Sequence, residues 1–374
     1  MPNVLLLCEY PTISGGERSM LTTLDGIRAA GIETAVIAPP EGSLAEALAA
    51  KGVEVLPFVF RDAAGNRFPQ DRLRAELAHL LGRRRPDLLH ANSLAMGRLS
   101  GPVAADFELP SIAHLRDIVR LSARAVADLN RHSRLLAVSA ATRAFHVAQG
   151  VAAEKTDVLY NGVDLNRFQP RPRCGYLHRE LGLAPEADLV GTIGQICLRK
   201  GQDVLVHAAA ILAEKLPNVH FVIVGERWSD KPESRQFEQA LRDAATDKLA
   251  GRLHFLGLRN DVDRVLNELS LLVHPARQEP LGRVLLEAAA SGVAVVATDV
   301  GGTREIFPPD CKAARLVPPD DPDAMAAAVL ELMGDEGLRA SLAAAARRRA
   351  ETAFDAERTT AALVEHYGEV LGKK

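Results

Sequence analysis

Two carboxylates in the second half of the chain, Glu279 and Glu287, have the type and spacing to bind hydroxyl groups of a ligand. Seven residues separate them, which on one continuous helix would place the side chains about 80° apart, since each residue turns the helix by about 100°. Pro280 and Gly282 lie between them and argue against one continuous helix. We therefore expect Glu279 in a loop and Glu287 inside the next helix, so that both face one cleft from different elements.

The elements that must hold these carboxylates run from His274 to Glu305. An apolar run ends at Val273, a loop with Pro and Gly follows, and small residues from about Gly282 to Ser291 predict a helix. A β-branched strand and the pair Gly301-Gly302 come next. This order predicts a βαβ unit whose loops emerge at the carboxyl ends of parallel strands, where open α/β sheets bind ligands.

Length and composition indicate a soluble globular protein of two or three domains. The chain has 374 residues, with 47% hydrophobic and 25% charged side chains, and a domain takes about 150 residues. The formal net charge of -3 gives no reason to expect nucleic acid as a partner. We expect the short apolar run Val4 to Cys8 to be a buried strand and not a signal peptide. No apolar stretch is long enough to span a bilayer, and four scattered cysteines predict a reducing cytoplasm and no metal site.

Apolar runs alternate with amphipathic ones along most of the chain, which predicts parallel, doubly wound α/β sheets. We expect strands at Val4 to Leu7, Thr34 to Ala38, Val53 to Phe58, Leu88 to Ala91, Ser111 to His114, Leu135 to Val138, Val158 to Leu159, Leu189 to Ile193, Val219 to Val224, Leu253 to Leu256, Leu271 to Val273, Val293 to Ala297 and Ala314 to Val317. Two Rossmann-like domains that face a cleft are predicted, at residues 1–168 and 169–354. Residues 355–374 are predicted to form a C-terminal helix.

The run from Glu279 to Ala288, E-P-L-G-R-V-L-L-E-A, resembles the E-x7-E signature of the retaining nucleotide-sugar glycosyltransferases of family four, or group 1. Those enzymes have the two-domain GT-B architecture. Asn161-Gly162-Val163-Asp164 is similar to the family's interdomain motif. The resemblance implies a retaining, metal-independent transferase that moves a sugar from a nucleotide-diphosphate sugar to a glycan or lipid-linked acceptor. It also implies that the last helix crosses back to pack on the first domain.

Such an enzyme must neutralise a diphosphate leaving group, with metal ions or with cations and helix amino termini. No D-x-D run ends a strand in this chain, so we expect the second solution and no metal or other cofactor. In the loop that opens the predicted helix Val204 to Lys215, Lys200 matches a family lysine that reaches the diphosphate. Gln195 stands where the family usually has an arginine, so either the site has fewer cations or Arg199 substitutes.

The remaining donor-site candidates follow other strand ends and helix starts. Glycines at such places let backbone N–H groups approach an anion closely, and Glu287 is placed to accept hydrogen bonds from ribose hydroxyls, as an acidic residue does in dinucleotide folds. The resemblance implies that Gly15 and Gly16, before the first helix, bind the donor. It implies the same for Leu281, Gly282 and Arg283, at the start of the helix that carries Glu287. Gly225 and Leu258 would flank the nucleoside.

Two expectations concern the reacting sugar and the acceptor. The resemblance implies that Glu279 binds the transferred sugar and that His114, at a strand end of the first domain, faces it. Arg116, Arg120 and Arg124 are spaced i, i+4 and i+8, so they form one basic stripe if that segment is helical. The stripe would either meet an anionic acceptor, with peripheral contact to the inner face of a membrane, or be a solvated helix face.

Other functions remain to be weighed against the transferase. A nicotinamide-dependent oxidoreductase would need G-x-G-x-x-G between the first strand and helix, with an acid about twenty residues on, and the chain lacks that pattern. The departure at Gln195 keeps open a catalytically silent nucleotide-sugar-binding module. A sugar-nucleotide epimerase or a glycogen-type phosphorylase of the same fold is less favoured, because the run from Glu279 to Glu287 matches transferases better.

Overall fold

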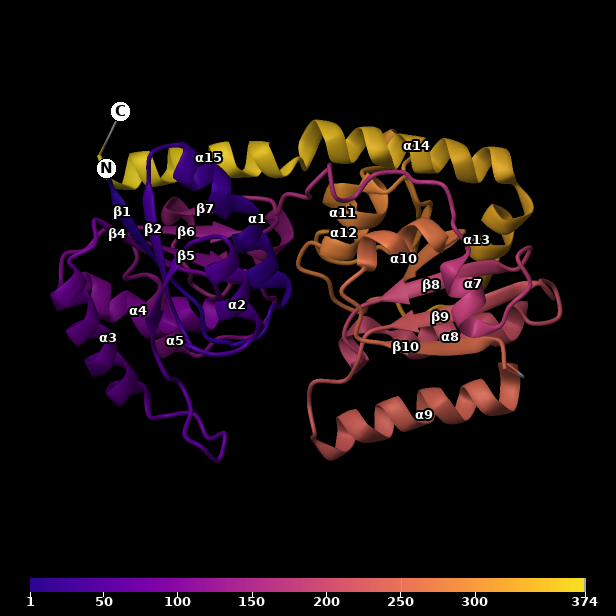
Figure 1. Ribbon diagram of the computed structural model, residues 1–374, viewed down its shortest axis with the longest axis horizontal. Helices are drawn as coiled ribbons and strands as arrows, with labels where there is room; N and C mark the ends of the chain where they lie inside the picture. Colours follow the sequence, from indigo (N-terminus) through magenta and orange to yellow (C-terminus); the bar gives the residue numbers. More distant parts are fainter. Residues whose placement is uncertain (250, 373–374) are drawn as a thin grey trace. The chain divides into compact units, whose positions relative to one another are not determined.

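The computed structural model describes residues 1–249 and 251–372. The chain divides into two compact units, one of Met1–Gly162 with the segment that returns at Ala356, and one of Val163–Asp355 (Figure 1). Residues 163–168, which the sequence placed in the first domain, belong to the second unit. The Val163 N–H donates to the carbonyl of Phe354 at 2.8 Å, and the Phe168 side chain is buried.

The first unit is built on a seven-stranded parallel sheet in the order β3-β2-β1-β4-β5-β6-β7. Its elements are β1 (Asn3–Leu7), α1 (Gly15–Ala29), β2 (Glu33–Ala38), α2 (Ser43–Ala50), β3 (Glu54–Pro57), α3 (Gln70–Arg84), β4 (Leu88–Ala91), α4 (Leu94–Asp106), β5 (Ser111–Leu115), α5 (Ala123–Leu129), β6 (Arg134–Ala137), α6 (Ala140–Val147), the 3-10 turn η1 (Ala153–Lys155), β7 (Thr156–Val158) and α15 (Ala356–Val370). The strand order reverses between β1 and β4, so the loops after these strands diverge and leave a crevice at the carboxyl edge.

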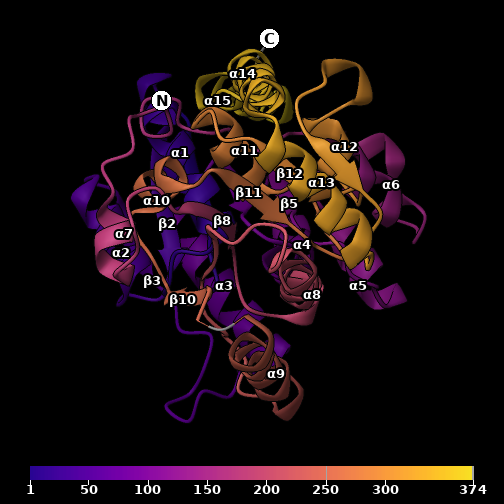
Figure 2. The ribbon, with the colours of Figure 1, turned by 90° about the vertical axis from the view of Figure 1, so that its right-hand side faces the viewer.

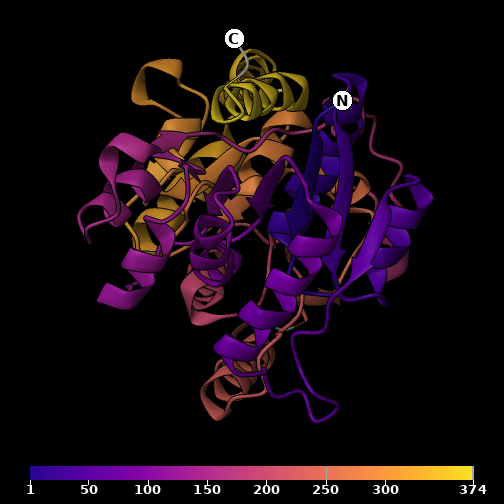
Figure 3. The same ribbon diagram turned by 90° about the vertical axis from the view of Figure 1, so that its left-hand side faces the viewer.

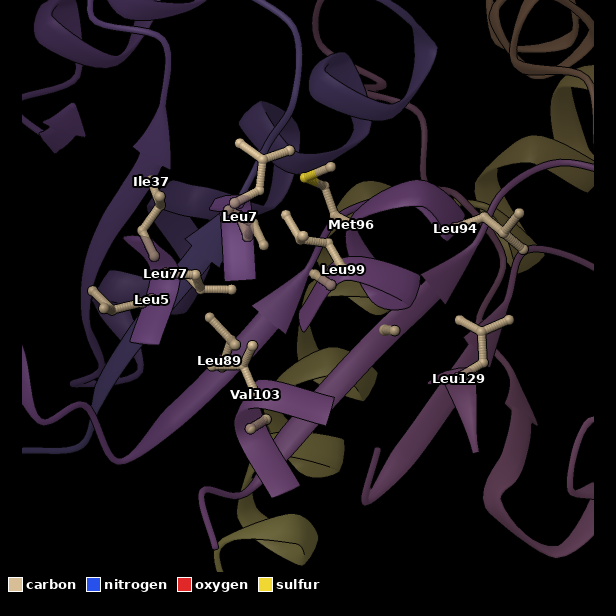
Figure 4. Packing of buried hydrophobic residues seen from close by; sticks show 14 of the residues in the cluster. Leu5, Leu7, Ile37, Leu77, Leu89, Leu94, Met96, Leu99, Val103 and Leu129 are labelled. Carbon is tan, nitrogen blue, oxygen red and sulfur yellow. The ribbon is translucent and has the colours of Figure 1, made fainter. Parts of the chain in front are cut away.

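Apolar side chains cover both faces of this sheet, because successive residues of a strand point to opposite sides. On one face Leu5 and Leu7 pack with Leu77 of α3 and Leu99 of α4 (Figure 4). On the other face lie clusters that include Val4 and residues of α15. The helix α15, yellow in Figures 1 and 3, lies beside α1. The predicted return of the last helix to the first domain is therefore observed within this unit.

The second unit is built on a six-stranded parallel sheet in the order β10-β9-β8-β11-β12-β13. Its elements are α7 (Tyr176–Leu181), β8 (Asp188–Ile193), η2 (Leu198–Lys200), α8 (Gln202–Leu212), β9 (Val219–Val224), α9 (Pro232–Leu249), β10 (Leu253–Gly257), α10 (Val262–Glu268), β11 (Leu271–His274), α11 (Arg283–Ala290), β12 (Val295–Thr298), α12 (Thr303–Ile306), η3 (Pro309–Cys311), β13 (Arg315–Val317), α13 (Pro322–Gly334) and α14 (Glu336–Ala353). Helices α8 and α13 lie side by side, and α11 lies beside α14 (Figure 2).

The predicted fold class, two Rossmann-like α/β domains, is confirmed. Every predicted strand is present, and its ends agree with the prediction to within two residues. Here too the strand order reverses, between β8 and β11. The loops after these two strands carry Lys200 and Glu279, so the topology brings both residues to the crevice edge of one sheet.

Candidate functional site

The carboxylate of Glu279 is the centre of the site in the second unit. It is 5% exposed and accepts hydrogen bonds from Lys200 Nζ at 2.5 Å and from His274 Nε2 at 2.8 Å. Lys200 ends the 3-10 turn η2 after β8, and His274 is the last residue of β11. Two neighbouring strand ends therefore hold one buried anion with one cation and one imidazole.

The charge state of this cluster follows from burial and pairing. Burial by itself would raise the pKa of Glu279, but the Lys200 ammonium and the hydrogen bond from His274 outweigh it and hold that pKa well below its usual range. Burial lowers the pKa of His274. Near pH 7 the site therefore contains a carboxylate, an ammonium and a neutral imidazole. Since a carboxylate only accepts, His274 carries its proton on Nε2.

The loop that carries Glu279 is fixed at several points. Gly301, with φ +53, lies so close that a Cβ there would come within 1.9 Å of the Glu279 carbonyl oxygen, and the N–H of Gly302 donates to that oxygen at 3.0 Å. Arg277, in the same loop, donates to both carboxylate oxygens of Asp203, at 2.8 and 2.7 Å. The Glu279 side chain is therefore held in place before any ligand binds.

Further cations and the second carboxylate surround this loop. Arg199 Nη1 donates to the carbonyl of Gln278 at 3.2 Å, so its guanidinium lies against the loop backbone. Gly282 is the N-cap residue of α11 with φ +101. Arg283, the first residue of that helix, donates from Nη2 to Oε1 of Glu287 four residues later at 2.9 Å, and both side chains are largely buried. Glu279 thus lies in a loop and Glu287 in a helix, as the sequence predicts.

The other predicted donor residues follow the carboxyl ends of β8, β9, β10 and β11. The Gln195 carbonyl follows β8 and accepts from Gln202 Nε2 at 2.8 Å. Gly225 follows β9, and its backbone lies against the carbonyl of Gly194. Leu258 follows β10 and is 61% exposed, whereas Leu281 is buried. These residues share the sheet edge at which Glu279 lies.

The first unit has its own polar cluster at the crevice edge. His114, on β5, is 4% exposed, and His90, on β4, is 1% exposed. His90 Nε2 and His114 Nδ1 are 2.7 Å apart, and His90 Nδ1 and the Tyr367 hydroxyl of α15 are 2.6 Å apart. Arg116 donates to the Asn92 carbonyl at 2.8 Å and to other groups beside it.

His90, Asn92, His114 and Arg116 line a small cavity of about 20 Å³, which is room for a water and not for a sugar. Gly15 and Gly16 start α1 beside it, since a Cβ on Gly16 would lie 3.2 Å from Arg116 Cδ. The carboxylate of Glu17 caps the same helix by accepting from the Ser14 N–H at 3.2 Å.

Among the described residues, no group of three or more His, Cys, Asp or Glu side chains is arranged to hold a metal ion. No helix in the described part of the chain is long and apolar enough to cross a bilayer.

Two family models match the chain. The model for glycosyl transferases group 1 matches residues 187–335, and the model for Glycosyltransferase Family 4 matches residues 13–167. Together they cover most of both units. The chain belongs to the group 1, family four glycosyltransferases.

Relatives of this glycosyltransferase match over most or nearly all of its length. The phosphatidyl-myo-inositol mannosyltransferase of Mycolicibacterium smegmatis is 29% identical and aligns over 98% of this chain and 94% of its own. The lipopolysaccharide core biosynthesis mannosyltransferase LpsB of Rhizobium meliloti is 29% identical over 70% of this chain and 77% of its own. Anabaena Alr3699/HepE, solved in complex with UDP-glucose, superposes with a TM-score of 0.87 at 25% identity, covering 98% of this chain and 99% of that one.

One structural premise about the glycosyltransferase was wrong. Arg116, Arg120 and Arg124 do not form a stripe on one helix, because residues 116–122 are not helical. The helix α5 begins only at Ala123, where the Ser122 hydroxyl accepts from a backbone N–H as the N-cap. Arg116 is drawn into the buried cluster by its bonds to Asn92, whereas Arg120 and Arg124 are exposed. The i, i+4 spacing was therefore not a helical signal here.

Three contributors to the two clusters were missed from the sequence. His274 had a usable signal, since it ends an apolar run five residues before Glu279. His90 and Tyr367 had none, because 277 residues separate them and only the packing of α15 on the sheet brings them together.

Proposed function

We propose that this glycosyltransferase is retaining and metal-independent, and that it moves a sugar from a nucleotide-diphosphate sugar to a glycan or lipid-linked acceptor. The observation that carries the proposal is the buried Glu279 carboxylate held by Lys200 and His274. A fixed, ionised carboxylate can accept hydrogen bonds from sugar hydroxyls and position the sugar at the reacting carbon.

Lys200 is the cation for the departing diphosphate. An ammonium has three N–H donors, and among the described residues its one recorded hydrogen bond goes to Glu279. The ammonium can therefore bridge Glu279 and a phosphate oxygen as negative charge develops on the leaving group. Arg199 and Arg283 add positive charge, and the N-terminus of α11 provides backbone N–H groups directed at the same edge.

Glu287 is proposed to accept hydrogen bonds from the ribose hydroxyls. In the structure it pairs with Arg283, four residues earlier on α11, which holds the carboxylate in one orientation. Gln195, Gly225, Leu258, Leu281 and Gly282 complete the donor site of this unit. Gly15 and Gly16, at the start of α1 in the first unit, are also proposed to bind the donor. The second unit is thus the proposed donor-binding domain and the first the acceptor-binding domain.

The acceptor proposal draws on the relatives. The Mycolicibacterium smegmatis and Rhizobium meliloti proteins are named for transfer to a phosphatidyl-inositol and to lipopolysaccharide core. We therefore propose an anionic, lipid-linked acceptor, with His114 facing the transferred sugar. Arg120 and Arg124 are exposed cations of the first unit that would meet such an acceptor or the inner face of a membrane, with the enzyme in the cytoplasm.

One assay tests the core of this proposal. UDP, GDP and ADP sugars are incubated with the purified protein, and release of the nucleotide diphosphate is measured with and without EDTA. The proposal is supported if nucleotide diphosphate is released from one donor class also in EDTA. NMR should then show that the transferred sugar has the same anomeric configuration in the product as in the donor. Release that EDTA abolishes and manganese restores would overturn metal independence, and donor binding without any release would make the protein a silent binding module.

A further inference from the structure

Tyr367, His90 and His114 are joined by two hydrogen bonds, so that the position of the proton in one bond determines the position of the proton in the other. The Tyr367 hydroxyl lies 2.6 Å from His90 Nδ1, and His90 Nε2 lies 2.7 Å from His114 Nδ1. A neutral imidazole has one N–H and one bare nitrogen, so it donates at one end and accepts at the other. The two hydrogen bonds therefore run in the same direction along the chain.

Both rings are neutral near pH 7. Burial, with the nearby charge of Arg116, lowers the pKa of His90 to about 3. The same two causes hold the pKa of His114 well below its usual range. Burial raises the pKa of Tyr367, so its hydroxyl keeps its proton.

The tyrosine end decides the direction. Tyr367 is fully buried, and within the described residues His90 Nδ1 is the one recorded partner of its hydroxyl. If His90 donated to Tyr367, the hydroxyl hydrogen would have no acceptor, and a buried donor without an acceptor is costly. The hydroxyl therefore donates to Nδ1, His90 carries its proton on Nε2, and that N–H donates to His114 Nδ1.

We propose that Tyr367 and His90 are positioning residues that hold His114 in the tautomer with the proton on Nε2. His114 lines the cavity at the crevice edge, and no described residue is a recorded partner of its Nε2. The ring thus presents a hydrogen-bond donor, and a sugar hydroxyl oxygen or a developing negative charge is the group it can bind. Because Nε2 already carries a proton, it cannot accept a hydrogen bond or take a proton from the substrate.

The sequence of α15 explains why the tyrosine reaches the sheet. Thr360, Leu363 and Tyr367 are the buried residues of this helix and follow the i, i+3, i+7 spacing of one helix face. Leu363 and Tyr367 pack with Val4 and Leu88 on the strands. The C-terminal helix therefore brings the phenol to the histidine pair through ordinary apolar packing.

The identity of the group that binds the His114 Nε2–H rests on the proposed function. The tautomer itself does not, since it can be measured without substrate. The full-length protein is labelled with ¹⁵N-histidine, and long-range ¹H–¹⁵N spectra report which ring nitrogen carries the proton. His132 is the internal reference, because its Nε2 lies 2.9 Å from the Gly97 carbonyl, which can only accept. We expect the Nε2–H form for His90, His114 and His132.

Three variants then test the role of each residue. Tyr367→Phe keeps the ring and removes the hydroxyl, and we expect His114 to show both tautomers and kcat to fall at least twofold, while the His132 signals stay unchanged. His90→Gln keeps an amide N–H that can donate to His114 Nδ1, so the Nε2–H form and kcat should be retained. Thr360→Val is the matched control, because it removes another buried hydroxyl of α15, which within the described residues bonds only to the Ala356 carbonyl.

The results separate this inference from the proposed function. An Nδ1–H form of His114 in the wild type would overturn it, as would unchanged His114 signals and kcat in Tyr367→Phe. Equal losses in Tyr367→Phe and Thr360→Val would show a structural role of the helix and would also overturn it. If the tautomers are as expected but no donor sugar is turned over, the proposed function fails while the assignment of the tautomer stands.

Discussion

The Glu279 cluster and the His114 cluster both contain buried histidine, but they differ in what holds them together. At Glu279 a buried carboxylate is kept ionised by an ammonium at 2.5 Å, so the site is defined by fixed charge. At His114 two neutral rings and a phenol are joined by hydrogen bonds, so the site is defined by the direction of those bonds. Activity should therefore depend most on the charges of the Glu279 cluster, and on single hydrogen-bond donors in the His114 cluster.

The largest expected effect is that of Lys200→Ala, which removes the cation of the charged cluster. Transfer should fall about 10²- to 10³-fold, or about 2.7–4 kcal/mol of transition-state stabilisation, because the diphosphate loses its counter-charge and Glu279 loses its partner. The measurement is kcat with saturating donor. Lys215→Ala, at an exposed position of the same unit, is the matched control, and equal activity of the two variants would contradict the proposed site.

Replacing the two carboxylates one at a time should separate turnover from binding. Glu279→Ala should lower kcat by up to about 10²-fold, because Glu279 is proposed to bind the sugar near its reacting carbon. Glu287→Ala should mainly weaken binding of the nucleotide diphosphate, measured by calorimetry, because Glu287 is proposed to bind the ribose. Wild-type turnover and wild-type affinity in both variants would show that the roles are wrongly assigned.

The exposed arginines of the first unit test whether that unit binds an anionic acceptor. Replacing Arg120 and Arg124 together with Ser should weaken binding to acidic liposomes by up to about 2 kcal/mol, since each basic residue near an anionic surface contributes about 1 kcal/mol. Transfer to an anionic acceptor should fall, while hydrolysis of the donor persists. Unchanged transfer and unchanged liposome binding would leave these side chains as solvated surface.

The neutral histidine cluster should make stability fall in acid. Because the folded-state pKa of His90 is lowered from 6.5 to about 3, the unfolded chain binds a proton between these values that the folded chain does not. Stability is therefore full above about pH 6.5 and is lost as the pH falls, by up to about 1.4 kcal/mol per pH unit for this group. Urea unfolding at pH 7, 6 and 5 should show a shallower decline for His90→Gln than for the wild type, and parallel declines would refute the assignment.

The smallest expected effect is that of Gln195→Arg, which adds the cation that the family usually has after this strand. Donor affinity should stay the same or improve by roughly fivefold, because a partly exposed charge pair contributes at most about 1 kcal/mol. The KM for the donor is the measurement. A loss of affinity would show that the amide at this position has a role of its own.

The sequence by itself determined the fold class, the strands and the position of Glu279 in a loop after a strand. Those strands are continuous apolar runs, because a parallel sheet is covered on both faces, so each could be located from local composition. Glu279 and Lys200 lie in the segments that follow such runs, Glu287 lies in the helix that comes next, and parallel strands bring their carboxyl ends to one edge. The position of each residue along the chain therefore predicted its place on the sheet.

Only the tertiary structure decided the partners of these residues. The pairing of Lys200 with Glu279 depends on β8 and β11 being neighbours, and local periodicity carries no information about strand order. The segment after His114 has helical spacing but takes the form of a loop, because Arg116 bonds to Asn92 in the buried cluster. The contact of Tyr367 with His90 joins residues that are 277 positions apart in the sequence. Such long-range contacts follow from the packing of whole elements, and no local pattern of residues records them.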